Sequence, residues 1–173
     1  MTAAALFEET IAPPAVAWGV LAALLAIPVA ALTAAIAHEP RAAPVLAAAL
    51  VFVLALVALL VWPCRLRLDR DGLHLRHGLF RHRVPAADLD PAAWRRLDLD
   101  QERGARPLLR TMGTGLPRFR GGWYRLRDRR RAFVLVNRWS PAWIYEPATG
   151  PVVLVTPARG QALVDAIRTL RRT

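Results

Sequence analysis

The sequence has 173 residues and a formal net charge of +11, yet 55% of its residues are hydrophobic. The two properties occupy different stretches. Residues 1–62 hold one Arg and three acidic residues, whereas residues 63–173 hold 23 Arg and 10 acidic residues, with no Lys anywhere and a single Cys. This composition excludes a disulfide scaffold, a disordered basic tail and a large enzyme of two full domains. It predicts a membrane segment followed by one small basic domain.

The N-terminal third contains two long apolar runs. Residues 11–37 carry no charge, and a helix counted from Ala15 would be about 34 Å long, enough to cross a hydrocarbon core of about 30 Å. A second uncharged run covers residues 42–64, and the residues between the runs leave room only for a tight turn. We therefore expect residues 1–63 to form a transmembrane helical hairpin, with spans at about 15–37 and 44–62.

Two other interpretations of these runs stay open, although both fit less well. A cleaved signal peptide would have a basic start and a shorter apolar run, whereas residues 1–10 contain no Lys or Arg. A buried helix pair of a soluble protein would suit the high Ala content, but neither run offers a polar face to water. Small residues recur every fourth position from Ala22 to Ala34, which favours close packing of the two helices, with dimerisation as the second option.

The distribution of Arg predicts the topology. The connecting turn has one Arg, whereas the stretch after the second run has four, at Arg65, Arg67, Arg70 and Arg76. Loops rich in Arg stay on the cytoplasmic side of a membrane. We therefore expect a multi-pass protein of the cell (plasma) membrane, with the N-terminus and the basic domain both in the cytoplasm.

The basic domain, residues 64–173, begins with a β-hairpin pattern. Leu alternates with Arg or His from residue 65, and turns are marked by Asp71-Gly72 and by Gly78-Leu79. If Gly78-Leu79 is a two-residue loop, His77 lies opposite Phe80, Arg76 lies opposite Arg81, and the pairing continues in this register along both strands. One face is then mostly apolar and the other wholly basic, a separation that a slip of one residue would destroy. The basic side consists of His74, Arg76, Arg81 and Arg83.

Further short segments of β pattern alternate with turns up to residue 156. We expect a glycine-rich loop at Gly113-Thr114-Gly115 and a final helix at about 157–171, introduced by Thr156-Pro157. The apolar positions of that helix recur at helical spacing, at Leu163, Val164, Ile167 and Leu170. The expected fold is therefore an antiparallel β domain of about seven strands, closed by a C-terminal helix.

Two stretches resemble bacterial pleckstrin-homology-like (PH-like) domains. They are LDRDGLHLRHGLFRHRVPAADL and RTMGTGLPRFRGGWYRLRDRRRAFVLVNRWSPAWIYEP. The second is similar to a membrane-tethered subset of that family, with two N-terminal transmembrane helices, in which a Gly-Thr-Gly/Pro loop precedes a Gly-Trp strand and a Val-Leu-Val strand. The resemblance covers residues 64–171 and implies a two-sheet fold of seven strands capped by the C-terminal helix. It implies no enzymatic activity, and the ligands of the family are poorly defined.

Arg side chains are the candidate contacts to anionic lipid headgroups or to an acidic protein partner. The planar guanidinium matches phosphate geometry, and each Arg near an anionic leaflet contributes about 1 kcal/mol. The candidates are Arg76, Arg81, Arg83, Arg118, Arg120, Arg125, Arg127, Arg129, Arg130 and Arg131. The same charge is as compatible with a solvated face that binds nothing. Nucleic acid is a less favoured partner because the domain is tethered to a membrane.

Other chemistry has little support in the sequence. A phosphate cradle at Gly113-Thr114-Gly115 would be weak because a strand is expected to follow it, not a helix. The three His residues of the first hairpin lack a Cys or a carboxylate at a spacing that would complete a metal site. Cys64 shows no paired base for nucleophilic chemistry. We therefore expect no catalytic residue, no metal and no cofactor.

The best-fitting function is a non-enzymatic, membrane-anchored interaction module on the cytoplasmic face. Trp139 falls in a predicted loop and is the candidate for an exposed anchor in the membrane interface. The alternative function is a subunit or regulator of a membrane protein complex, in which the transmembrane hairpin itself is the binding surface. The pattern specifies no oligomeric state.

Overall fold

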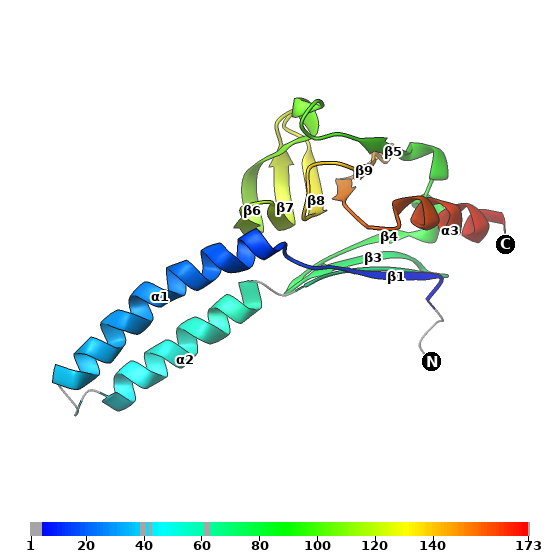
Figure 1. Cartoon of the computed structure of the whole chain (residues 1–173). Coiled ribbons are helices and arrows are strands. Elements are labelled where there is room, and N and C mark those ends of the chain that lie inside the picture. The colour runs from blue at the N-terminus through cyan, green and yellow to red at the C-terminus, as the bar shows by residue number, and fades with distance from the viewer. Residues whose placement is uncertain (1–4, 39–40, 42, 61–62, 173) are drawn as a thin grey trace.

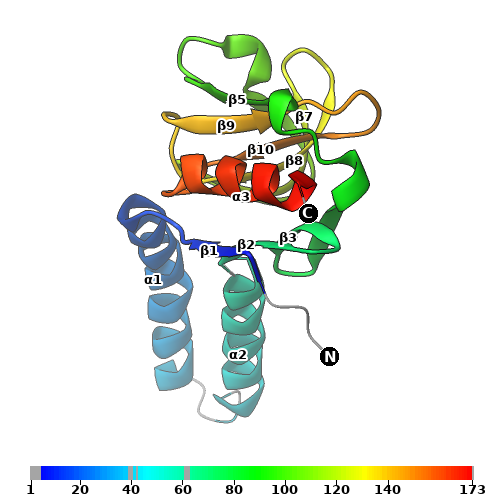
Figure 2. The ribbon, with the colours of Figure 1, turned by 90° about the vertical axis from the view of Figure 1, so that its right-hand side faces the viewer.

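The computed structural model of the chain describes residues 5–38, 41, 43–60 and 63–172. Two helices, α1 (Ala15–His38) and α2 (Ala43–Leu60), lie side by side and project together from a β-rich body (Figures 1 and 2). The segment Ala15–Ala37 of α1 is long and apolar enough to cross a membrane. Its apolar side chains are not packed inside the protein, since Ile27 is 72% and Leu24 61% exposed. Helix α1 is therefore not the buried core helix of a soluble protein.

Helix α2 provides a shorter apolar stretch. Within the described residues this stretch is Pro44–Ala55, and Phe52 on it is 70% exposed. Residues 61–62, at the end of the second predicted span, and most of the predicted turn lie outside the described residues. Among the described residues, one helix thus has the length and composition of a membrane span, where two spans were predicted.

The segment before α1 forms a strand that the sequence did not predict. Strand β1 (Phe7–Ile11) pairs antiparallel with β2 (Cys64–Asp69), which follows α2, so that Ile11 lies opposite Cys64. The carboxylate of Glu9 on β1 also accepts hydrogen bonds from the backbone N–H groups of Ala158 and Arg159. The two helices are therefore an insertion between two paired strands, and the β-rich body includes a segment that precedes them.

Strands β2, β3 (Gly72–His77) and β4 (Phe80–Pro85) complete a sheet in the order β1-β2-β3-β4. The predicted register of the β3–β4 hairpin is confirmed: His77 lies opposite Phe80, and Arg76 lies opposite Arg81. Because side chains alternate between the faces of a strand, this register puts the Leu side chains on one face and the Arg side chains on the other.

A second sheet has the order β5-β9-β10-β8-β7-β6, and all its pairs are antiparallel except β8 with β10. Its strands are β5 (Trp94–Leu97), β6 (Pro107–Leu116), β7 (Phe119–Leu126), β8 (Arg131–Val136), β9 (Ala142–Tyr145) and β10 (Val152–Val155). The described residues therefore form ten strands, not about seven, because β1 was missed and three strands of the second sheet have only four residues.

Two apolar cores hold the body together. The first lies between the two sheets and the C-terminal helix α3 (Gly160–Arg172), and it includes Leu66, Phe133 and Ile167. The second lies on the other face of the six-stranded sheet and includes Tyr124 and Ile144. The six-stranded sheet is thus buried on both faces, whereas the four-stranded sheet is buried on one only. The C-terminal helix and the two-sheet arrangement agree with the predicted fold.

The predicted glycine-rich loop is wrong, because Gly113-Thr114-Gly115 lies within β6. Gly113 pairs with Gly122 of β7 beside an irregularity in the register, and both have a positive φ, at 141° and 113°. A Cβ on Gly113 would lie 2.1 Å from the carbonyl oxygen of Gly121, so only glycine allows the two strands to approach this closely. These glycines serve strand pairing.

Candidate lipid-facing surface

The outer face of the four-stranded sheet carries a group of basic side chains, here called the basic face: Arg65, Arg67, His74, Arg76, Arg81 and Arg83. Strand pairing arranges them in two rows. The first row joins Arg65, Arg76 and Arg81 across β2, β3 and β4. The second row joins Arg67, His74 and Arg83. Each of these residues alternates with one that points into the body, so the sheet turns all of them outward.

The basic face points to the side of the body from which the helices project. In Figure 2, α3 and the six-stranded sheet lie above the four-stranded sheet, and α1 and α2 extend below it. The inner face of the four-stranded sheet packs against α3 and the six-stranded sheet. The helices also run beyond the end of the four strands in Figure 1, so a membrane crossed by α1 would lie closest to the part of the basic face next to the helices.

The two rows differ in their balance of charge. In the first row, next to the helices, the neighbour of Arg65 on β1 is Thr10, and no Arg of this row has an ion pair within the described part of the chain. In the second row, a carboxylate oxygen of Asp69 lies 3.7 Å from Nε of Arg67 and 3.2 Å from Nε2 of His74. Uncompensated positive charge is therefore concentrated beside the helices.

An apolar tip stands at the same end of the sheet. The β3–β4 turn contains Leu79, whose side chain is 72% exposed. The neighbouring pair His77–Phe80 is aligned with Cys64 and Ile11, the residues that connect the sheet to the two helices. An exposed Leu flanked by Arg76 and Arg81 has the amphipathic character of a contact to a lipid interface.

The later Arg segment is divided between two ends of the body. Arg118 and Arg120 lie at the end near α1, because Arg120 is opposite Val136 and the next residue, Asn137, donates to the carbonyl of Ala12 at 3.1 Å. Arg125 and Arg131 are paired with each other at the opposite end, about 16 Å further along β7. The turn that they flank carries Arg127, Arg129 and Arg130. Of the seven predicted contact residues in this later segment, five are therefore remote from the helices.

Several of these Arg side chains have partners within the body. The guanidinium of Arg130 lies 2.7 Å from Asp128 and 2.8 Å from Glu146, and that of Arg131 lies 4.5 Å above the ring of Trp123. Arg130 lowers the pKa of the Glu146 carboxyl, against the opposing effect of desolvation. Arg125, Arg127 and Arg129 are exposed and point to solvent at the distal end.

Trp139 is not the exposed anchor that the sequence predicted. Its side chain is half-buried and packs against the second core, and the guanidinium of Arg120 lies 5.0 Å from the centre of its ring. Its backbone carbonyl accepts a hydrogen bond from Leu99 at 3.0 Å. The loop that carries Trp139 folds back on the sheet, which a local sequence pattern does not reveal.

The His and Cys residues of the first hairpin have separate surroundings. Nδ1 of His77 lies 3.3 Å from Sγ of the buried Cys64, His82 packs against Trp123, and His74 contacts Asp69. Burial raises the pKa of the Cys64 thiol well above its ordinary value, which keeps it protonated. The described residues contain no group of three or more His, Cys, Asp or Glu side chains that could hold a metal ion.

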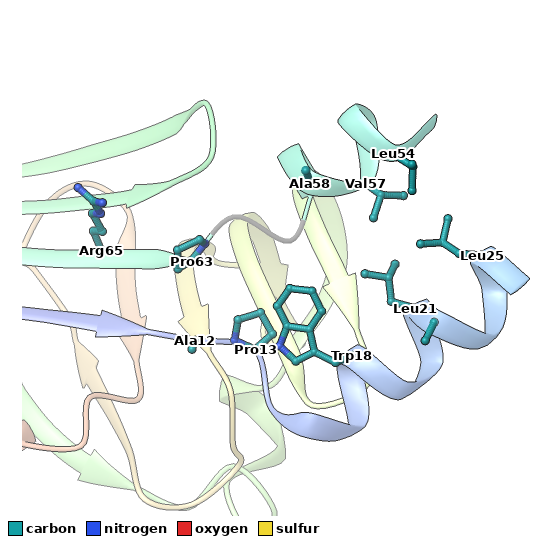
Figure 3. A pocket seen from close by; sticks show the side chains of 11 residues that line it. Ala12, Pro13, Trp18, Leu21, Leu25, Leu54, Val57, Ala58, Pro63 and Arg65 are labelled. Carbon is teal, nitrogen blue, oxygen red and sulfur yellow. The ribbon is translucent and has the colours of Figure 1, made fainter. Parts of the chain in front are cut away.

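A cleft of about 670 Å³ opens between α1 and α2 where they join the body (Figure 3). Trp18, Leu21 and Leu25 line it from α1, and they face Leu54 and Val57 of α2. The wall toward the body is formed by Ala12, Pro13, Pro63 and Arg65. Arg65 is the one charged side chain among the described residues of the wall.

Sequence reasoning missed three residues of this surface, although signals for them were present. Arg65 and Arg67 alternate with Leu66 and Leu68 in the same way as the predicted residues of β3, but they were used for the strand pattern and the topology and were not counted among the contact residues. Leu79 was treated only as a turn residue. Their common position became visible once strand pairing had aligned β2 with β3.

Comparison of the chain with protein-family models, with curated proteins and with solved structures gives no significant match.

Proposed function

We propose that this protein is a non-enzymatic, membrane-anchored interaction module of PH-like type, whose basic face rests on the anionic headgroups of the cytoplasmic leaflet. Helices α1 and α2 both cross the membrane in this proposal, and the Arg-rich exit of α2 keeps the body in the cytoplasm. One observation carries the proposal: the Arg row of the four-stranded sheet that has no ion pair among the described residues lies at the end of the sheet from which the helices project.

The energetics favour a lipid surface over a merely solvated face. Three Arg side chains directly opposite one another on neighbouring strands repel, and such a row destabilises a sheet unless anions compensate it. Headgroup phosphates supply that compensation at about 1 kcal/mol for each Arg. The helices hold the body at the membrane, so the contact needs little affinity of its own.

The proposal can be tested on the full chain in lipid nanodiscs. In the variant Leu79→Cys the new thiol takes an environment-sensitive dye, whereas the native Cys64 is fully buried and protected. We expect a blue shift of the dye in nanodiscs with phosphatidylglycerol that is lost at high salt and absent in pure phosphatidylcholine. A dye at Gln101→Cys, on the exposed loop that follows β5, serves as the control and should not respond. Equal emission at position 79 in both lipids would refute contact through the basic face.

The alternative function is a subunit or regulator of a membrane protein complex. It is supported by the apolar side chains that α1 and α2 leave exposed, among them Ile27 and Phe52. In that case a protein should co-purify in mild detergent in fixed ratio and be lost on substitution of Ala26 by Trp, with no response of the dye at position 79 to lipid charge.

A further inference from the structure

The cleft between the helices arises from the way the sheet holds their ends. Pairing of Ile11 with Cys64 fixes the point where α1 leaves the body next to the point where α2 returns. From these points the helices run side by side, with Leu21 and Leu25 facing Leu54 and Val57 (Figure 3). The small side chains of Ala22 and Ala58 leave space between them. The space is therefore bounded by sheet, α1 and α2, and it opens toward the lipid surroundings of the helices.

The chemistry of the cleft changes along its length. Among the described residues, the part between the helices is lined by apolar side chains, and at the body end the exposed Arg65 lies beyond Pro63, with its guanidinium directed away from α1 and α2 (Figure 3). Arg65 forms no ion pair within the described part of the chain, and its neighbours across the strands are Thr10 and Arg76. An apolar cleft with a positive charge just outside its mouth is complementary to an amphiphile whose chain enters the cleft and whose anionic head stays outside it.

We propose that this cleft binds one anionic phospholipid of the cytoplasmic leaflet, with an acyl chain between α1 and α2 and its phosphate on Arg65. This inference rests on the membrane anchoring in the proposed function. The volume of the cleft lies within the range of small-molecule sites, which are mostly apolar with a few polar groups that fix the orientation of the ligand. The charge at the mouth distinguishes this occupant from a partner helix, which would fill the apolar part without engaging Arg65.

A lipid bound in the cleft would also contribute to the contact between the basic face and the membrane. Arg65 belongs to the first row of the basic face, so a lipid bound there places its phosphate within the same field as Arg76 and Arg81. The cleft would then select an anionic headgroup through geometry, whereas the rest of the face attracts headgroups through charge alone.

The experiment uses the indole of Trp18, which lines the cleft. The full chain is reconstituted in nanodiscs that contain brominated phosphatidylglycerol or brominated phosphatidylcholine, and the fluorescence difference between the wild type and Trp18→Phe isolates the Trp18 signal. We expect half-maximal quenching at a mole fraction at least about threefold lower for phosphatidylglycerol, because one site is filled selectively. Arg65→Gln should remove this preference. Ala22→Leu, which fills the cleft from the α1 side, should remove the preference while Arg65 is intact.

The matched control is Arg70→Gln, which removes an equal charge from the exposed turn after β2 and should retain the preference. Equal quenching by both lipids, no quenching by either, or a preference that survives Arg65→Gln would each overturn the inference. A normal response of the dye at position 79 together with equal quenching of Trp18 would refute the cleft site alone. Loss of the dye response with Trp18 preference retained would refute the surface contact alone.

Discussion

Arg65, Arg76 and Arg81 lie beside the helices without a carboxylate partner in the described residues, whereas Arg130, at the far end of the body, is held between Asp128 and Glu146. Both groups look alike in the sequence, as runs of Arg in strands and turns. The difference lies in what each guanidinium faces. The positive charge of an Arg that bridges carboxylates is balanced within the protein, whereas an Arg without an ion pair leaves its charge able to attract an anion.

The largest expected effect concerns the contribution of β1 to the stability of the four-stranded sheet. A chain that lacks residues 1–62 loses β1, including the buried Phe7 and Ile11, and we expect it to lose at least about 5 kcal/mol of unfolding free energy. A variant in which Asn-Gly replaces residues 12–63 keeps β1 joined to β2 by a two-residue hairpin turn and should remain folded. Urea unfolding followed by circular dichroism compares the two, and equal midpoints would show that β1 is dispensable.

The next effect concerns the seam between the two sheets, at Gly121. A Cβ there would lie 2.6 Å from the ring of His77, which is buried and held by Cys64 and by the edge of Phe119. Gly121→Ala should therefore lower the unfolding free energy by about 2 kcal/mol through overpacking. Gly104→Ala, with no atom within 4 Å of the new Cβ, is the control. If the clash is the cause, Gly121→Ala should lower the unfolding free energy by less when His77 is also replaced by Ala. An unchanged loss would show that the clash with His77 is not the cause.

The sequence was informative where the pattern is local and silent where distant segments meet. Alternation around Gly78-Leu79 was enough to predict the register of β3 with β4, and helical spacing was enough to predict α3. Strand β1 was missed because its partner lies beyond both helices. Trp139 was misplaced because its surroundings come from β7 and the loop at Leu99.

The Arg segment shows the same limit within the site. Arg120 and Arg125 are close in sequence, but the length of β7 separates them between the two ends of the body. Their composition predicted a basic surface without indicating which part of it faces the membrane. The direction of the helices relative to the sheet decides that question, and no local pattern encodes it.

A smaller effect compares the two Arg groups directly. With the variant in which Asn-Gly replaces residues 12–63, sedimentation with vesicles that contain phosphatidylglycerol measures the affinity of the body for a membrane. Arg81→Gln should weaken binding about fivefold, which corresponds to about 1 kcal/mol for one Arg at the surface. Arg125→Gln removes the same charge at the distal end and should leave binding nearly unchanged. Equal losses in both variants would mean that net charge, and not the basic face, determines binding.

The smallest effect concerns His82, whose ring lies between Trp123 and Phe133. Burial lowers the pKa of His82, and the positive charge of Arg131 lowers it further. In the unfolded chain the pKa returns to about 6.5, so below that pH the unfolded state takes up a proton that the folded state resists. The folded state should therefore lose stability as the pH falls from 7.5 to 5.5.

The test of this pH dependence is a series of thermal unfolding curves. His82→Phe keeps the aromatic contacts and removes the proton, so its melting temperature should fall less between pH 7.5 and 5.5 than that of the wild type. His74→Gln, which replaces a half-exposed His on the outer face, is the control. The carboxyl groups whose pKa is lowered, such as those of Asp128 and Glu146, titrate below this range and do not contribute. Parallel curves for wild type and His82→Phe would show that protonation of His82 does not contribute to the pH dependence.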